Sequence, residues 1–142
     1  MPCCASAVAV ATNTPPPANT AYNAVTKPKL DTPDTATARL TALRAAHPGP
    51  DYHIHSAKFF MDGVYENRTA ANLAPYADAP GGNAPCMFSA EQTRAMMTAL
   101  DAARFAIHVH VIGDAAVRRA IEGLEAARAA NGSWPAQHQL AH

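Results

Sequence analysis

The chain has 142 residues, and its 11 Lys and Arg are balanced by 11 Asp and Glu, so its formal net charge is zero. That length suits one ordinary domain. Balanced charge argues against a nucleic acid or an anionic membrane as partner, because binding to phosphate needs a surplus of Lys and Arg. The sequence also lacks an apolar run of ~20 residues that would span a bilayer. No basic residue precedes Lys27, so the n-region of a secretory signal is missing.

The cysteines are Cys3, Cys4 and Cys86. An odd number, with two of them adjacent, argues against a framework of disulfides. We therefore expect a reduced, cytoplasmic protein.

Residues 1–33 are rich in Ala, Thr, Asn and Pro, with three consecutive prolines at 15–17. Prolines interrupt both helices and the hydrogen-bond ladders of sheets, and this segment has no apolar period. The sequence predicts a low-complexity, disordered arm over residues 1–33, followed by one domain over residues 34–142.

Helices and strands alternate along the predicted domain. Apolar spacing predicts helices over 35–47, 89–103 and 115–130, and strands over 52–61, 105–112 and 137–142. Ser89 and Gln92 form a capping box, and Asp114 is a good N-cap. Residues 63–88 form a long loop with several Pro and Gly. This order is typical of an α/β fold with a parallel sheet and right-handed crossovers.

Side chains that can bind metal occur on all three predicted strands. They are Lys58 on the first, His108 and His110 on the second, and His138 and His142 on the third. In parallel α/β sheets, ligands bind beyond the carboxyl ends of the strands. Neutral imidazole is the commonest metal ligand in proteins. The pattern therefore indicates that His110 and His142 share one Zn²⁺, with Lys58 close by.

Each of these residues also has a structural interpretation. A lone His in a strand is most often a hydrogen-bonded core or surface residue. Taken alone, Lys58 suits an edge position from which its amine reaches water. His53 and His55 repeat the spacing of His108 and His110 but lie early in their strand, so we do not expect them to bind metal.

Three motifs together resemble a known family. They are A-K-F-F-M-D-G at 57–63 with T-A at 69–70 and P-Y-A-D at 75–78, F-A-I-H-V-H-V-I-G-D-A-A-V at 105–117, and Q-H-Q-L-A-H at 137–142. In order and spacing they resemble the amidohydrolase-3 family of metal-dependent hydrolases, which includes N-substituted formamide deformylases. The resemblance covers residues 35–142.

The resemblance implies a (β/α)8 barrel with one or two divalent metals, usually Zn²⁺. Lys58 matches a lysine that is carboxylated and bridges the metals, which is chemically reasonable because a desolvated lysine loses its proton readily. His110 and His142 match the metal-binding histidines of strands five and six. A metal-activated hydroxide would attack a carbon–nitrogen bond, other than a peptide bond, in a small-molecule amide or formamide. His108 and His138 would line this site.

The resemblance also implies that Asp62 and Gly63 shape the loop over the substrate. Asp114 is expected to cap its helix rather than act in catalysis.

The chain departs from the family pattern in several places. A full barrel needs about 250 residues, and only three predicted strands match, about strands four to six. The H-x-H of strand one and the metal-binding aspartate of strand eight have no counterpart. Ala141 stands where the family has glutamate, and Arg104 where it usually has glycine. We therefore expect a partial TIM barrel, a truncated fragment that is inactive or binds Zn²⁺ weakly.

Two alternatives stay open. In the first, the chain is a non-catalytic α/β module whose open sheet edges bind a partner chain or a second copy of itself. In the second, it is a small metal-storage or metal-sensing domain. Hydrolysis of N-formyl or N-acyl substrates would exclude the first, and tight stoichiometric Zn²⁺ binding without hydrolysis would favour the second.

Overall fold

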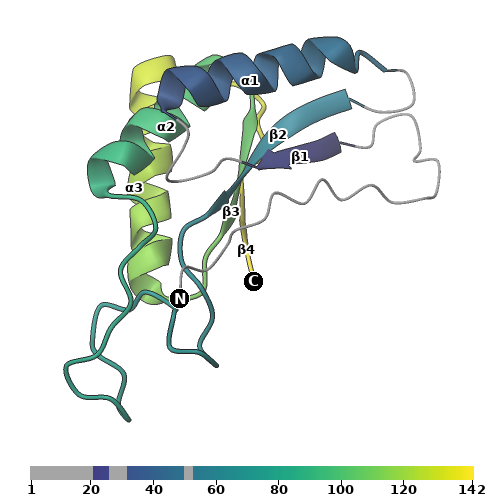
Figure 1. Cartoon of the computed structure of the whole chain (residues 1–142). Coiled ribbons are helices and arrows are strands. Elements are labelled where there is room, and N and C mark those ends of the chain that lie inside the picture. Colours follow the sequence, from purple (N-terminus) through teal and green to yellow (C-terminus); the bar gives the residue numbers. More distant parts are fainter. Residues whose placement is uncertain (1–20, 26–31, 50–52) are drawn as a thin grey trace.

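The computed structural model describes residues 21–25, 32–49 and 53–142. Its described part contains four strands and three helices in the order β-α-β-α-β-α-β (Figure 1). The strands are β1 (Ala21–Val25), β2 (His53–Phe60), β3 (Ala106–His110) and β4 (Gln139–Ala141). The helices are α1 (Pro33–Ala46), α2 (Ala90–Ala102) and α3 (Asp114–Asn131).

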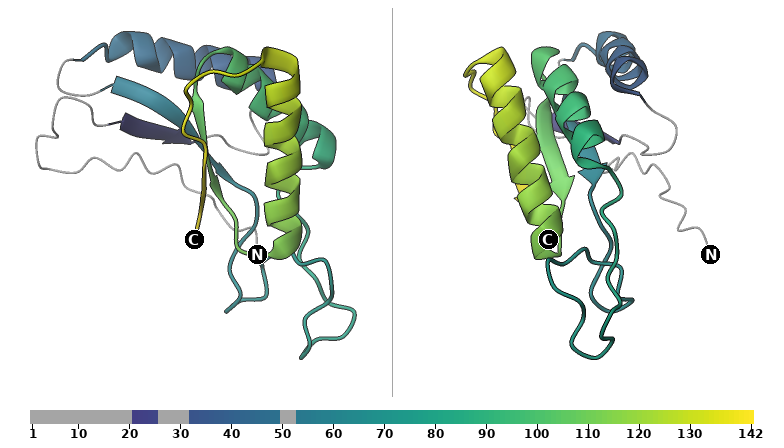
Figure 2. Two further views of the ribbon diagram at one scale, coloured as in Figure 1. Left: turned by 180° about the vertical axis from the view of Figure 1, so that it is seen from behind. Right: turned by 90° about the vertical axis from the view of Figure 1, so that its left-hand side faces the viewer.

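All neighbouring strands pair in parallel, in the order β1-β2-β3-β4. A helix separates each strand from the next, as parallel pairing requires, because the chain must return to the same end of the sheet. The helices lie together on one side of the sheet (Figure 2). The predicted α/β class and the alternation of elements are confirmed.

The core lies between the sheet and the helices. Ala57, Phe59, Ile107 and Val109 point from β2 and β3 towards the helices, and each is at most 1% exposed. The helices contribute Leu40, Met96, Met97, Leu100, Ala116 and Ala120 to the same cluster. Because side chains alternate along a strand, residues 58, 60, 108 and 110 must face the other way.

Capping fixes where two helices begin. Ser89 and Gln92 hydrogen-bond reciprocally before α2, as predicted from the sequence. Thr32 and Thr35 form a second capping box before α1, and Pro33 follows at the first helical position. Threonine at the third position replaces the usual Glu or Gln, so the motif was not apparent in the sequence.

Strand β1 lies inside the segment 1–33, where the sequence predicted no regular structure. For residues 21–25 that expectation is wrong, because pairing with β2 supplies a ladder that local composition does not encode. Helix α1 also begins at Pro33, one residue inside the predicted arm. Residues 1–20 and 26–31, with Cys3 and Cys4, lie outside the described residues.

Asp114 does not cap helix α3. The N-cap is Gly113, which has no side chain, and Asp114 is the first residue of the helix. Its carboxylate instead accepts a hydrogen bond from the backbone N–H of Leu73, at 2.7 Å. The residue therefore holds the 63–88 loop against the start of α3. Within the described ranges, no helix combines the length and apolarity needed to cross a membrane.

Candidate functional site

The face of the sheet turned away from the helices carries the predicted site residues. Lys58 on β2 is directly opposite His108 on β3, and Phe60 is opposite His110. The Nζ of Lys58 lies 2.9 Å from the Nε2 of His108. Period-two alternation places both pairs on one face, so the helix-facing residues between them fix the direction of these side chains.

Lys58 and His108 are both driven towards their neutral forms. Lys58 is 9% exposed, and burial lowers the pKa of its amine. Burial also lowers the pKa of His108, with smaller contributions from the nearby charges of Lys58 and His142. A neutral amine and a neutral imidazole both carry lone pairs, which are what a metal ion or an electrophile needs.

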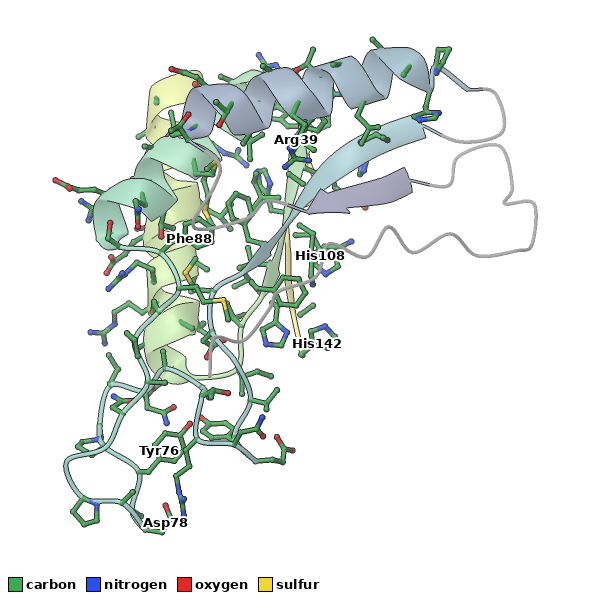
Figure 3. All side chains as sticks on the ribbon, viewed as in Figure 1. Arg39, Tyr76, Asp78, Phe88, His108 and His142 are labelled. Carbon is green, nitrogen blue, oxygen red and sulfur yellow. The ribbon has the colours of Figure 1, made fainter. Side chains whose placement is uncertain are left out.

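His110 and His142 lie together at the carboxyl end of the sheet. Their ring centres are 5.1 Å apart, with the rings tilted by 45°. His142 follows β4 and has a φ of 81°. Figure 3 shows His108 part-way along β3 and His142 nearer the carboxyl ends of the strands. The structure thus brings together His110 and His142, the two residues for which the sequence predicts a shared Zn²⁺.

Two further groups hold the ring of His110, and the sequence analysis did not identify either. The ring stacks on Phe60, with centres 5.2 Å apart and 29° between planes. Its Nε2 donates to the carbonyl oxygen of Gly63 at 2.9 Å. The alternation from Lys58 to Phe60 is a signal that would have placed Phe60 on this face. The role of the Gly63 carbonyl depends on the loop's backbone conformation and has no such signal.

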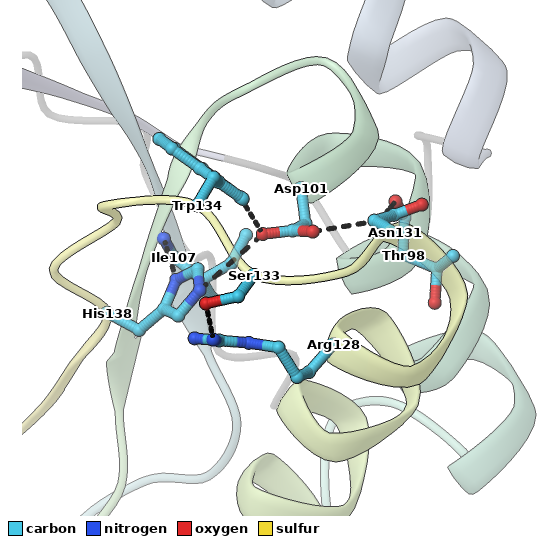
Figure 4. Close-up of polar contacts among 8 residues, drawn as sticks. All are labelled: Thr98, Asp101, Ile107, Arg128, Asn131, Ser133, Trp134 and His138. Carbon is cyan, nitrogen blue, oxygen red and sulfur yellow. Dashed lines mark hydrogen bonds and ion pairs between the residues drawn. The ribbon is translucent and has the colours of Figure 1, made fainter.

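His138 lies apart from the other four predicted site residues. It precedes β4, and its Nδ1 accepts a hydrogen bond from the backbone N–H of Ile107 at 3.1 Å. Its Nε2 lies 3.5 Å from a carboxylate oxygen of Asp101 on α2. These partners place His138 near the amino ends of β3 and β4 (Figure 4), so the structure does not bring it to Lys58.

The Asp101 carboxylate organises this second cluster. It accepts hydrogen bonds from Trp134 Nε1 at 2.7 Å and Asn131 Nδ2 at 2.8 Å, and is only 2% exposed. Burial lowers the pKa of His138, although the charge of Asp101 acts in the opposite direction. Since Nδ1 already accepts a hydrogen bond, protonation there would break it, which favours the neutral ring.

The donor set near Lys58 is compatible with a metal ion but small. Within the described ranges, no three His, Cys, Asp or Glu side chains are grouped to hold a metal. His110 and His142 meet as a pair. Two imidazoles bound to one tetrahedral ion at ~2.0–2.1 Å have ring centres about 5 Å apart, which matches the observed spacing.

Comparisons with known proteins identify the family and support the fold. A model of the amidohydrolase family matches residues 17–142. An uncharacterized metal-dependent hydrolase from Pyrococcus horikoshii OT3 is 26% identical, with a TM-score of 0.56 over 66% of this chain and 20% of that one. An uncharacterized metal-dependent hydrolase from Pyrococcus furiosus is 24% identical, with a TM-score of 0.60 over 75% of this chain and 22% of that one.

The similarity to the Pyrococcus furiosus structure bears on the fold alone. This chain spans about a fifth of the length of each of the two solved structures. No curated protein matches it. The family match begins at residue 17 and therefore includes β1.

Proposed function

Because the chain belongs to the amidohydrolase family, we propose that it contributes to a metal-dependent hydrolase that cleaves carbon–nitrogen bonds other than peptide bonds. Amides and N-substituted formamides are the proposed substrates. One observation carries the proposal. Four side chains share the helix-free face of a parallel sheet, in the half towards the carboxyl ends of its strands: Lys58, His108, His110 and His142.

The proposed setting is a (β/α)8 barrel in which β2, β3 and β4 are strands four, five and six. Parallel neighbours in sequence order, with helices on one side only, support this placement. In such barrels the helix-free face is the interior, and active sites lie at the carboxyl ends of the strands. The four residues would then face the interior at its catalytic end.

The proposed metal ligands are Lys58, His110 and His142, and the proposed metal is Zn²⁺. When the neutral amine of Lys58 forms an N–C bond to CO2, one C=O π bond opens onto its oxygen and the nitrogen releases a proton to solvent. The product is a carbamate whose two oxygens share one negative charge. Imidazole nitrogens and such oxygens suit zinc. Bound there, the metal would lower the pKa of water towards ~7 and polarise the substrate carbonyl.

The chain's own residues have defined tasks in this scheme. The hydrogen bond between His108 Nε2 and Lys58 Nζ restrains the amine on the interior face. Phe60 stacks on His110 and limits rotation of its ring. His138 takes no part, because its contacts lie at the other end of the strands.

The test combines metal content with hydrolysis. We expect Zn²⁺ to bind weakly to the full chain, and Lys58→Ala and His110→Ala each to reduce the bound stoichiometry. His55→Ala is the matched control, because it removes an exposed imidazole from the same strand as Lys58. Turnover of N-formyl or N-acyl substrates above a metal-free control would support the activity. Unchanged stoichiometry in both site variants would contradict the assignment.

A second candidate function is association through a sheet edge. Strand β4 has only three residues, and Leu140 on it is 40% exposed. Exposed apolar edge strands pair readily with other strands. If edge pairing is the function, Leu140→Lys would shift a dimer to monomer in sedimentation velocity and Lys58→Ala would not. A monomeric unmodified chain would exclude this candidate.

A further inference from the structure

Asp62 is a buried carboxylate at the end of β2 whose hydrogen bonds join two separate segments. It is 1% exposed. Its Oδ1 accepts from the backbone N–H of Ile112 at 3.0 Å, and its Oδ2 from that of Gly113 at 2.8 Å. Oδ2 also accepts from the N–H of Ala71, in the 63–88 loop, at 2.9 Å. One side chain thus binds both the loop and the turn between β3 and α3.

The surrounding backbone is built around this carboxylate. The N–H groups of Ala115 and Ala116, in the first turn of α3, donate to the carbonyl oxygen of Ala71 at 3.1 and 3.3 Å. A Cβ at Gly113 would lie 1.9 Å from that same oxygen, so only glycine permits the approach. The loop therefore contacts the β3–α3 turn through backbone groups that leave no room for a side chain.

The same contacts surround His110. Gly63, directly after Asp62, accepts a hydrogen bond from His110 Nε2. Ile112, held by Asp62, is two residues beyond His110. Because a carbonyl oxygen can only accept, the contact requires the hydrogen on Nε2 and leaves the ring's lone pair on Nδ1. Groups of this kind, one layer behind a metal ligand, set its tautomer and orientation.

We propose that Asp62 is a positioning residue that couples the 63–88 loop to His110. By holding the loop and the β3–α3 turn together, it keeps the Gly63 carbonyl against Nε2, so that His110 presents Nδ1 to the interior of the site. The role of Asp62 in metal binding rests on the proposed function. Its effects on the tautomer of His110 and on how firmly the 63–88 loop is held can be measured without metal.

Asp62→Asn tests the proposal. Asparagine keeps the shape but turns an amide N–H₂ towards backbone donors, so at least one of the three hydrogen bonds must break. We expect ¹⁵N NMR of the metal-free chain to show a single Nε2–H tautomer for His110, and a mixture in Asp62→Asn. We also expect trypsin to cut after Arg68, inside the loop, about tenfold faster in the variant, as for loss of a hydrogen bond to a charged group.

Asp101→Asn is the matched control, because it alters an equally buried carboxylate at the other end of the sheet. It should leave the His110 tautomer and cleavage after Arg68 unchanged. An unchanged tautomer in Asp62→Asn, or the same change in Asp101→Asn, would overturn the proposal. Failure of the chain to bind zinc, with the tautomer shift intact, would reject the proposed function and leave the coupling standing.

If Asp62→Asn does not fold, amide hydrogen exchange on the unaltered chain tests the proposal instead. If Asp62 couples the segments, Ala71 in the loop and Ile112 and Gly113 in the turn open as one unit, with equal opening free energies. Unequal opening free energies would contradict the coupling.

Discussion

At the amino end of the strands His138 is enclosed by hydrogen-bond partners, whereas at the carboxyl end His108 lies against the amine of Lys58. The first ring accepts from the Ile107 backbone and faces the Asp101 carboxylate. The second meets another nitrogen base. A base that meets complementary hydrogen-bond partners stabilises a fold. Two neighbouring bases with lowered pKa values are typical of sites that bind ligands or react.

The half-buried Arg44 and the buried Lys58 differ in the same way. Arg44 at the amino end donates to the carbonyl oxygens of Ile54, Ala103 and Arg104, at 3.0 to 3.1 Å. Its guanidinium also lies 3.4 Å from the centre of the Phe105 ring. Lys58 instead lies against the imidazole of His108, with 2.9 Å between Nζ and Nε2, and burial of its amine costs free energy. We therefore expect the amino end of the sheet to contribute more to stability than the carboxyl end.

The largest expected effect is at Asp101. Asp101→Ala removes the acceptor of Trp134 Nε1 and one of the two acceptors of Asn131 Nδ2, and it takes a charged group out of these partly buried hydrogen bonds. We therefore expect the free energy of unfolding to fall by about 3 kcal/mol. Urea denaturation of the variant and the unmodified chain measures it. A loss below about 1 kcal/mol would show that the cluster does not hold the amino end together.

A matched pair of substitutions separates the two ends. Arg44→Met should lower the free energy of unfolding by about 2 kcal/mol, because three backbone carbonyls lose their donor. Lys58→Met should change it by less than about 1 kcal/mol or raise it, because an apolar side chain avoids the cost of burying an amine. Denaturant titrations of both variants check this, and equal losses would remove the contrast between the ends.

The pH dependence of stability sharpens the comparison at His138. Its pKa is lowered in the folded chain, so between that pKa and about 6.5 the unfolded chain binds more protons. Stability from the neutral ring is therefore complete above about pH 6.5 and is lost as the pH falls below it. Unfolding measured from pH 8 to 5 should show a smaller acid loss in His138→Gln than in the unmodified chain. Parallel curves would contradict the lowered pKa.

The smallest effect is expected at the tip of the loop. Arg68 and Asp78 form an ion pair there, and both side chains are more than half exposed. Through this contact the Asp78 carboxylate raises the pKa of Arg68, and the Arg68 guanidinium lowers the pKa of Asp78. Because solvent screens such pairs, Asp78→Asn should leave the thermal midpoint unchanged within error. A clear drop would mean that the loop is seated by its tip rather than by Asp62.

Local patterns predicted the elements that carry their own signals. The Ser89 and Gln92 box marked the start of α2, and Gly132 follows the end of α3. Strand β1 could not be predicted, because its ladder comes from β2 rather than from its own residues. Asp114 resembled an N-cap in sequence, but the loop's return to Leu73 gives its carboxylate another partner.

The candidate site was predicted in part for similar reasons. Alternation along β3 put His108 and His110 on one face, and the motifs pointed to Lys58 and His142. His138 shares a motif with His142, yet it precedes β4 and turns to Asp101, a residue on a distant helix. Only tertiary contacts distinguish the two histidines. The role of the Gly63 carbonyl likewise depends on tertiary contacts and has no signal in the local sequence.

Anomalous diffraction at the zinc edge, on crystals of the chain grown with Zn²⁺ and bicarbonate, tests the central claim most directly. The account predicts one peak between the rings of His110 and His142, with density for a carbamate on Lys58 reaching the same ion. A peak bound elsewhere, with the two rings and the amine unliganded, would contradict it.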